Sequence, residues 1–428
     1  MRDLMILGIV MYGLFRTLST PYIGVYLWSW ISLMSPHLLT WGFASTFPFA
    51  MLIAGGTLLG LITGKQAKLK IWSPESGVLL TLIIWVCITT IFAVDQEGAL
   101  KELDRYLKIQ LFIFLTLALM SDRQKLDGFI WVMVISLGFY GVKGGIFTAL
   151  TGGGARVWGP DGSFIGGNNE VALALIMTVP LMRYLQLQSE NKWIKRGLLA
   201  AILLSAAAIL GTQSRGAFLG IMAIGAFFWV KSPRKVESSI MVGIVAAVVL
   251  LFMPQTWWDR MNTIQTYDQD ASAMGRVNAW WVAWRTANSS LTGGGANMFT
   301  PEMFQKYAPD PLDVHDVHSI YFEMLGEQGW IGFCLFVTLG ILVWRRCGLI
   351  IKTCKNDPAQ KWAVDLALML QVSLIGYATA GAFLGLSYYD YYYDLIATAL
   401  ITWRLVNKNT EAGLAPTRAK LIKRQHQY

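Results

Sequence analysis

Long runs of apolar residues recur along almost the whole chain of 428 residues, separated by short polar segments. Many of these runs approach the ~20 residues that an α-helix needs to cross the ~30 Å hydrocarbon layer of a bilayer. The runs are continuous and lack the period-two alternation of transmembrane β-strands. The pattern therefore predicts an all-α protein, a polytopic transmembrane helical bundle of about 12 spans.

The predicted helices can be placed from the apolar runs. The first apolar segment, residues 3–35, is interrupted around Arg16–Pro21, which predicts either two thin spans or one discontinuous span. The remaining runs predict helices at about 44–63, 76–94, 104–120, 128–150, 168–187, 196–211, 215–230, 238–254, 318–344, 362–385 and 388–405.

The positions of Lys and Arg predict the orientation of this bundle. Basic clusters occupy alternate loops, and such clusters mark the cytoplasmic side of a membrane protein. They are Lys65/Lys68/Lys70, Arg123/Lys125, Lys192/Lys195/Arg196, Lys231/Arg234/Lys235 and Arg345/Arg346/Lys352/Lys355. The chain therefore divides into N-terminal transmembrane helices (1–254), a long outer loop with short helices (255–317), C-terminal transmembrane helices (318–405) and a basic cytoplasmic tail (406–428).

Composition supports the membrane prediction. The chain is 55% hydrophobic and only 14% charged, whereas soluble proteins carry roughly a quarter charged residues. In a soluble protein the net charge of +9 would suggest nucleic acid, but here it follows the topology, so no nucleic-acid partner is predicted. The cysteines have no paired spacing, which disfavours a disulfide framework or a zinc site.

Two arginines on the predicted outer side are candidates for binding an anion. Arg215 lies in G-T-Q-S-R-G, where a positive charge is costly at the edge of the bilayer. Arg276 precedes a segment with Trp280 and Trp284 on one helical face, which predicts a helix lying at the membrane interface with an anion-binding N-terminus. The alternatives are a snorkelling Arg215 that only marks the interface and an Arg276 on a solvated loop.

His318 is the candidate proton acceptor. It begins the helix that follows the long loop, and its ordinary pKa of about 6.5 leaves it mostly neutral at neutral pH. The alternative is a histidine that anchors the helix at the interface. His315 could instead form a metal pair with His318 and with Asp313 or Asp316, but no further ligands follow at helical spacing, so we expect no metal. Glu323 follows in the same helix and is a candidate for a supporting role.

Two polar clusters on the outer side complete the set of predictions. Asn168, Asn169 and Glu170 follow a glycine-rich loop at 151–167 and are expected to cap the next helix. A tyrosine cluster near the C-terminus is expected to form an aromatic belt at the outer membrane surface. Its members are Tyr388, Tyr389, Tyr391, Tyr392 and Tyr393.

The start of the predicted helix 318–344 resembles the C-terminal motif of the O-antigen ligase superfamily. The matching residues are His318-Ser319-x-Tyr321 and Gly326-x-x-Gly329-x-x-Gly332. The S-R-G at 214–216, the glycine turn at 293–295 and the long loop agree with it, although Tyr321 stands where Leu is commoner. The stretch W-S-W-I-S-L-M-S-P-H resembles the exosortase-associated O-glycosylation ligase branch.

This resemblance implies a metal-independent glycosyltransferase of the bacterial inner membrane without a cofactor. It would move an O-antigen-like glycan from undecaprenyl diphosphate to an acceptor hydroxyl, with lipid A-core as the expected acceptor, at the periplasmic face. His318 would be the general base, and Arg215 and Arg276 the diphosphate ligands. Candidates for supporting roles are His315, Tyr321, Glu323 and Asn169.

Three other functions remain open at this point. A Wzy-type polysaccharide polymerase and a protein O-oligosaccharyltransferase share the motif and differ from a ligase in their acceptors. A transporter for a polar lipid or an anion is the alternative without catalysis. The transferase hypothesis requires His318, Arg215 and Arg276 to converge at one cavity that opens toward the periplasm.

Overall fold

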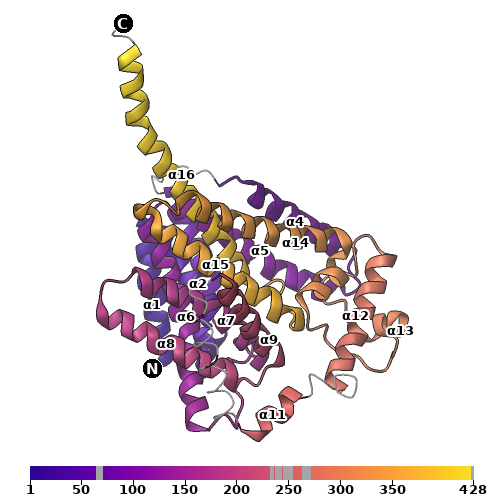
Figure 1. The fold of residues 1–428 in the computed structure, drawn as a ribbon. Coiled ribbons are helices and arrows are strands. Elements are labelled where there is room, and N and C mark those ends of the chain that lie inside the picture. The colour runs from indigo at the N-terminus through magenta and orange to yellow at the C-terminus, as the bar shows by residue number, and fades with distance from the viewer. Residues whose placement is uncertain (64–70, 232–235, 237–242, 244–253, 263–270, 426–428) are drawn as a thin grey trace.

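The computed structural model of the protein describes residues 1–428 except 64–70, 232–235, 237–242, 244–253, 263–270 and 426–428 (Figure 1). All the regular elements of the described residues are helices, which confirms the all-α prediction. The N-terminal helices are α1 (Arg2–Ser19), α2 (Tyr22–Met34), α3 (Phe49–Thr63), α4 (Pro74–Ile91), α5 (Gln96–Leu119), α6 (Arg123–Leu150), α7 (Asn168–Gln188), α8 (Lys192–Gly211) and α9 (Arg215–Lys231). Two 3₁₀ turns, η1 (Pro36–Leu39) and η2 (Phe43–Ser45), follow α2.

The C-terminal half contains both short and very long helices. They are α11 (Gln255–Asn262), α12 (Ala271–Ser289), α13 (Pro301–Tyr307), α14 (Ile320–Cys354), α15 (Lys361–Ala380) and α16 (Asp390–Gln425), with the 3₁₀ turns η4 (Pro358–Gln360) and η5 (Gly381–Phe383). Helix α16 continues well past its predicted end near residue 405. Except for Gly243 and Pro254, the helix predicted at 238–254 lies outside the described residues.

The predicted break in the first apolar segment is confirmed. Helix α1 ends at Ser19 and α2 begins at Tyr22, so the segment forms two separate helices. Among the described residues, six helices are long and apolar enough to cross a membrane. They are Pro74–Ile91, Arg123–Leu150, Asn168–Gln188, Lys192–Gly211, Ile320–Cys354 and Pro358–Phe383. These helices support a multi-pass membrane protein, while the total of about 12 spans and the periplasmic loop stay predictions.

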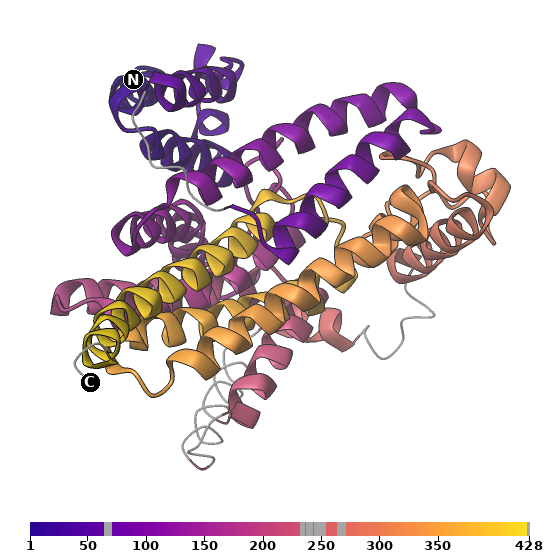
Figure 2. The same cartoon turned by 90° about the horizontal axis from the view of Figure 1, so that it is seen from above.

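Helix α14 connects the main parts of the bundle. Figure 2 shows it running obliquely beside α4, with α12 packed against one end. Toward its other end, the buried carboxylate of Glu75 in α4 accepts a hydrogen bond of 2.8 Å from Arg346 Nε. A buried pair of this kind is costly to break, because the remaining charge would lack a partner. It therefore fixes α4 against α14 far from the outer loop.

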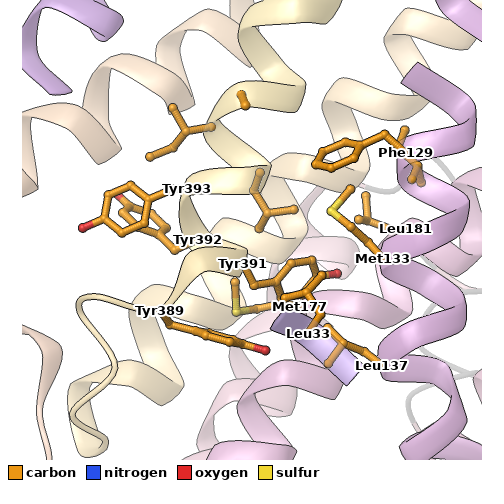
Figure 3. Close-up of a cluster of buried hydrophobic side chains, with 14 of the residues drawn as sticks. Leu33, Phe129, Met133, Leu137, Met177, Leu181, Tyr389, Tyr391, Tyr392 and Tyr393 are labelled. Atoms are coloured by element: carbon orange, nitrogen blue, oxygen red, sulfur yellow. The ribbon is translucent and has the colours of Figure 1, made fainter. Parts of the chain in front are cut away.

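The tyrosine cluster is buried in the bundle, so the predicted aromatic belt is wrong. Tyr389, Tyr391, Tyr392 and Tyr393 are at most 3% exposed. Figure 3 shows these four side chains among apolar side chains from neighbouring helices, such as Leu33 and Met177. Helix α16 begins inside the bundle and contacts α5, α6, α14 and α15, so its first turn has no side that faces lipid.

Helix α14 is broken at Gly329, within the glycine motif. Gly329 has φ 63° and ψ −173°, a combination that is essentially restricted to glycine. The break removes helical partners from nearby carbonyl oxygens, and the glycine turn 293–295 replaces them. The N–H of Gly294 donates to Gly326 O and that of Gly295 to Glu327 O, each at 2.9 Å.

Helix α4 and the segment after it complete the connection around this break. Trp85 Nε1 donates to Gln328 O at 2.8 Å, and Val94 N donates to Gly294 O at the same distance. Because an unsatisfied carbonyl in a membrane costs several kcal/mol, these bonds make the broken helix stable. Three distant segments of the chain are thereby joined at one point.

We predict that Gly329→Ala destabilises the protein by at least about 1–3 kcal/mol, since alanine strongly disfavours this backbone conformation. Its Cβ would also lie 2.5 Å from Leu291 O. The control is Gly77→Ala in α4, where a Cβ would meet nothing within 4 Å, so no loss is expected. Thermal unfolding in detergent measures both variants, and equal melting temperatures for them would contradict the importance of the break.

Candidate functional site

His318 lies at the end of an extended segment, directly before α14. Its backbone has φ 41°, a left-handed conformation that costs most side chains on the order of 1–3 kcal/mol. The preceding residue is fixed, because Trp280 Nε1 donates to Val317 O at 2.9 Å. The Trp280 ring also stacks on Phe322 with centroids 4.9 Å apart. Packing between α12 and α14 thus holds His318 in place.

The His318 ring is surrounded by charged and titratable groups. Its Nδ1 lies 3.4 Å from Asp316 Oδ2, and its side chain is 30% exposed. Burial lowers the pKa of His318 below its ordinary value of 6.5. The charges of Arg276 and His315 lower this pKa further, whereas that of Asp316 raises it. His315 in turn lies 2.6 Å from Asp313, measured from Nδ1 to Oδ1.

Arg276 lies inside α12 and not at its start, so its predicted position before the helix is wrong. Helix α12 begins at Ala271, which puts Arg276 in its second turn. The neighbouring Gly275 packs directly against the His315 ring, where a Cβ would lie 2.6 Å from Nδ1. This close approach explains how α12 brings the charge of Arg276 near enough to act on His318.

The segment before His318 is tied to the same helix through Asn278. The Asn278 amide donates to Asp310 O at 2.7 Å and to Asp313 O at 2.9 Å, and its oxygen accepts from Asp310 N. Asn278 therefore acts as a buried clamp between α12 and the chain that leads to α14. The interfacial position predicted for α12 stays a prediction.

Arg215 is the first residue of α9 and lies on the far side of η5 from the start of α14. A Cβ on the next residue, Gly216, would lie 3.1 Å from Phe383 Cβ in η5. A Cβ on Gly381, at the other end of η5, would lie 2.8 Å from Ile320 at the start of α14. The structure thus places Arg276 near enough for its charge to act on His318. The turn η5 lies between the start of α9, where Arg215 is, and the start of α14.

The expected side-chain cap of α7 is wrong. The N-cap is Gly167, which has no side chain, and Asn168 instead donates to Thr212 O at 2.9 Å. This bond fixes the start of α7 against the turn between α8 and α9. Asn169 is half-buried in the first turn.

Glu170, next to Asn169, is a site residue whose role the sequence did not indicate. Its charge interacts with those of Arg276 and Asp316, so the start of α7 lies beside the His318 cluster. Its presence directly after a glycine-rich loop was the only available signal.

A cavity of about 410 Å³ extends from Glu170 into the bundle. It is lined by residues of α5, α7 and α14 and of the loops near them. They are Glu102, Arg105, Gly162, Ser163, Phe164, Gly166, Gly167, Glu170, Ala296, Asn297, Glu323, Glu327, Gly385, Leu386 and Tyr388. Of the predicted site residues, Glu323 is part of this lining.

The two carboxylates of α14 that line the cavity are held by hydrogen bonds. Glu323 Oε2 accepts from Ser387 N at 2.8 Å. Glu327 is 5% exposed and accepts from Asn297 N at 3.0 Å and from the Tyr388 hydroxyl at 2.7 Å. The break two residues after Glu327 is what brings Asn297, beyond the glycine turn, within reach of it.

Arg105 contributes the basic side chain of the cavity. Its guanidinium lies 3.4 Å from the centroid of the Phe164 ring, in a cation–π contact. The charges of Glu102 and Asp390 also act on Arg105. The predicted helix began at about residue 104, which put Arg105 at its outer end, but only the fold reveals the carboxylates around it.

The remaining predicted site residue, Tyr321, faces α15. Its hydroxyl donates to Ala378 O at 2.9 Å, so it anchors the first turn of α14. In the described part of the chain, no three side chains of His, Cys, Asp or Glu are grouped as a metal site would require.

Two known protein families match different parts of the chain. Residues 1–190 match a family of unknown function (DUF5935), and residues 200–337 match the O-Antigen ligase family. No curated protein matches the chain. The second match contains Arg215, Arg276, His318 and the break at Gly329. Over residues 200–337 the chain is therefore similar to the O-antigen ligase family.

Proposed function

We propose that the protein is a metal-independent glycosyltransferase that moves an oligo- or polysaccharide from undecaprenyl diphosphate to an acceptor hydroxyl. The reaction would take place at the periplasmic face of the bacterial inner membrane, with lipid A-core as acceptor. The match of residues 200–337 to the O-antigen ligase family supports a ligase- or polymerase-type transferase. The observation that carries the proposal is that Arg276 lies close enough to His318, at the start of α14, for its charge to lower the pKa of that histidine.

The electrostatic part of the reaction falls to the arginines. A glycosyl diphosphate is already activated, so the enzyme must hold it and stabilise the charge that develops on the leaving group. A guanidinium can bind a phosphate through two parallel hydrogen bonds, and Arg276 would do so. Arg215 would reach the diphosphate from the other side of η5. Without substrate, the carboxyl group of Glu170 interacts with the charge of Arg276.

The proton transfer falls to His318. Asp316 beside Nδ1 favours the tautomer with its proton on that nitrogen, which leaves Nε2 as the base. As Nε2 takes the proton of the acceptor hydroxyl, the oxygen forms a bond to the anomeric carbon. The bond from that carbon to the diphosphate oxygen breaks, and undecaprenyl diphosphate leaves with the electron pair. General-base catalysis of this kind contributes ~10²–10⁴ in rate.

Two related enzymes differ from this proposal only in their acceptor. A polymerase would use a second lipid-linked glycan, and a protein O-oligosaccharyltransferase would use a protein hydroxyl. Reconstituted protein supplied with a lipid-linked oligosaccharide and each acceptor in turn distinguishes them. The exosortase-associated branch likewise remains a proposal.

The break in α14 also favours a transporter, because discontinuous helices form the binding sites of many transporters. With the protein reconstituted in vesicles and the lipid-linked oligosaccharide labelled, a transporter would move this lipid across the membrane and form no glycosylated product. Product formed with any acceptor supports the transferase.

We predict that His318→Ala and His318→Asn lower the transfer rate by about 10²–10⁴ while donor binding is retained. Asparagine tolerates the left-handed backbone of residue 318, so this variant separates loss of the base from backbone strain. His37→Asn, in η1, serves as the control and should keep its activity. Transfer at the normal rate by folded His318→Asn would remove His318 from the mechanism.

The pKa of His318 predicts the pH dependence of transfer. The active base is the neutral imidazole, and its pKa is lowered below 6.5. The rate should therefore fall in acidic solution, with the midpoint of this fall below pH 6.5. Since Asp316 raises this pKa, Asp316→Asn should move the acidic limb to lower pH, and a move to higher pH would contradict the assignment.

We expect Arg276→Lys to weaken binding of an isoprenyl diphosphate analogue about 10- to 100-fold, the equivalent of one charged hydrogen bond of ~1.5–3 kcal/mol. Lysine keeps the positive charge but cannot form the two parallel hydrogen bonds of a guanidinium. Arg285→Lys is the matched control on the same helix, where Arg285 binds Tyr307 O. Titration calorimetry measures both affinities, and an unchanged affinity in Arg276→Lys would exclude Arg276 as a ligand.

A further inference from the structure

The cavity beside the His318 cluster is lined by more acidic than basic side chains. Its lining contains the carboxylates of Glu102, Glu170, Glu323 and Glu327 but only the guanidinium of Arg105. Its volume of about 410 Å³ falls within the ~300–1,000 Å³ typical of small-molecule sites. A diphosphate would find one guanidinium and four carboxyl groups here, so the lining favours a ligand without negative charge.

Two glycines in the lining make room for the carboxylates. A Cβ on Gly167 would lie 2.0 Å from Glu170 Oε2, and one on Gly385 would lie 3.2 Å from Glu323 Oε1. A larger residue at position 167 would displace the Glu170 carboxylate. The backbone of two separate loops is therefore shaped around these acidic groups.

The other side chains of the lining suit a sugar. Carboxylate oxygens accept hydrogen bonds from neighbouring hydroxyls, and the guanidinium of Arg105 can donate to ring or hydroxyl oxygens. Phe164 and Tyr388 provide aromatic surface for the apolar face of a pyranose. An aromatic surface with a few fixed polar groups is the usual composition of a small-ligand site.

Glu170 connects the cavity to the proposed transfer site. It lines the cavity, and its charge interacts with those of Arg276 and Asp316. A ligand in the cavity would thus lie next to the groups proposed to hold the diphosphate and to accept a proton. The diphosphate occupies the cationic side, which leaves the anionic side for the attacking molecule.

We propose that this cavity binds the acceptor sugar that carries the reacting hydroxyl, and that it selects a neutral or amino sugar over an acidic one. The inference rests on the proposed function, because only a transferase has an acceptor. The charge preference of the cavity can be measured without any transfer.

The test uses three probes of equal size: a methyl glucoside, the methyl glycoside of glucosamine and a methyl glucuronide. Their binding to the purified full-length protein is followed by saturation-transfer NMR. We expect the acidic glycoside to bind at least about tenfold more weakly than the other two, because like charges at a binding site are strongly unfavourable. Equal binding of all three, or no binding of any, would overturn the proposal.

Charge-neutral variants assign the preference to the cavity. Glu102→Gln and Glu323→Gln should each reduce the discrimination against the glucuronide several-fold. A glutamine at position 323 can still accept the hydrogen bond from Ser387 N. Two variants on different helices guard against one that fails to fold. Glu302→Gln in α13 removes an exposed outer carboxylate outside the cavity and should change nothing. Unchanged discrimination in folded Glu102→Gln and Glu323→Gln would place the preference elsewhere.

The same samples separate this inference from the proposed function. Charge-selective sugar binding without product in any acceptor assay would contradict the transferase and leave the sugar site intact. Transfer that depends on His318 but shows no sugar discrimination would support the transferase and overturn the assignment of the cavity.

Discussion

The break of α14 at Gly329 is the constraint on which the packing of α4, α12 and the cavity around α14 depends. A helix interrupted within a membrane protein needs new partners for its carbonyl groups, because lipid offers none. The glycine turn at 293–295 supplies two of them, and its own backbone can approach so closely only because it lacks side chains. The same connection brings Asn297 to the Glu327 carboxylate. One backbone irregularity thus shapes the cavity and anchors the long loop.

Opposite charges are separated on either side of this arrangement. Arg276 and His318 form a cationic and basic side at the start of α14, while the glutamates of the cavity form a side rich in carboxyl groups. Glu170 belongs to both, since it lines the cavity and interacts with Arg276. A transferase that joins a diphosphate-linked donor to a hydroxyl acceptor needs a cationic site for the diphosphate and a separate, neighbouring site for the acceptor.

The sequence predicted the helices well, because each long apolar run has few alternatives to a helix. It also predicted the break between α1 and α2, which Pro21 and the polar residues before it mark. The burial of Tyr391 and its neighbours was not predictable, since tyrosines at a membrane interface and in an interior have the same local pattern. The cavity could not be predicted for another reason, because long-range packing alone brings Glu102, Glu170 and Glu323 together. Gly329 was noted as part of a motif, but its backbone angles depend on contacts with the distant glycine turn.

The most direct test of this account is an experimental structure with a non-reactive glycosyl diphosphate analogue carrying an isoprenyl tail. We predict that its phosphates contact Arg276 and Arg215 and that its anomeric carbon faces His318 Nε2, beside the empty acidic cavity. Phosphates bound at another site, with Arg276 and His318 facing away from the sugar, would contradict the proposed reaction.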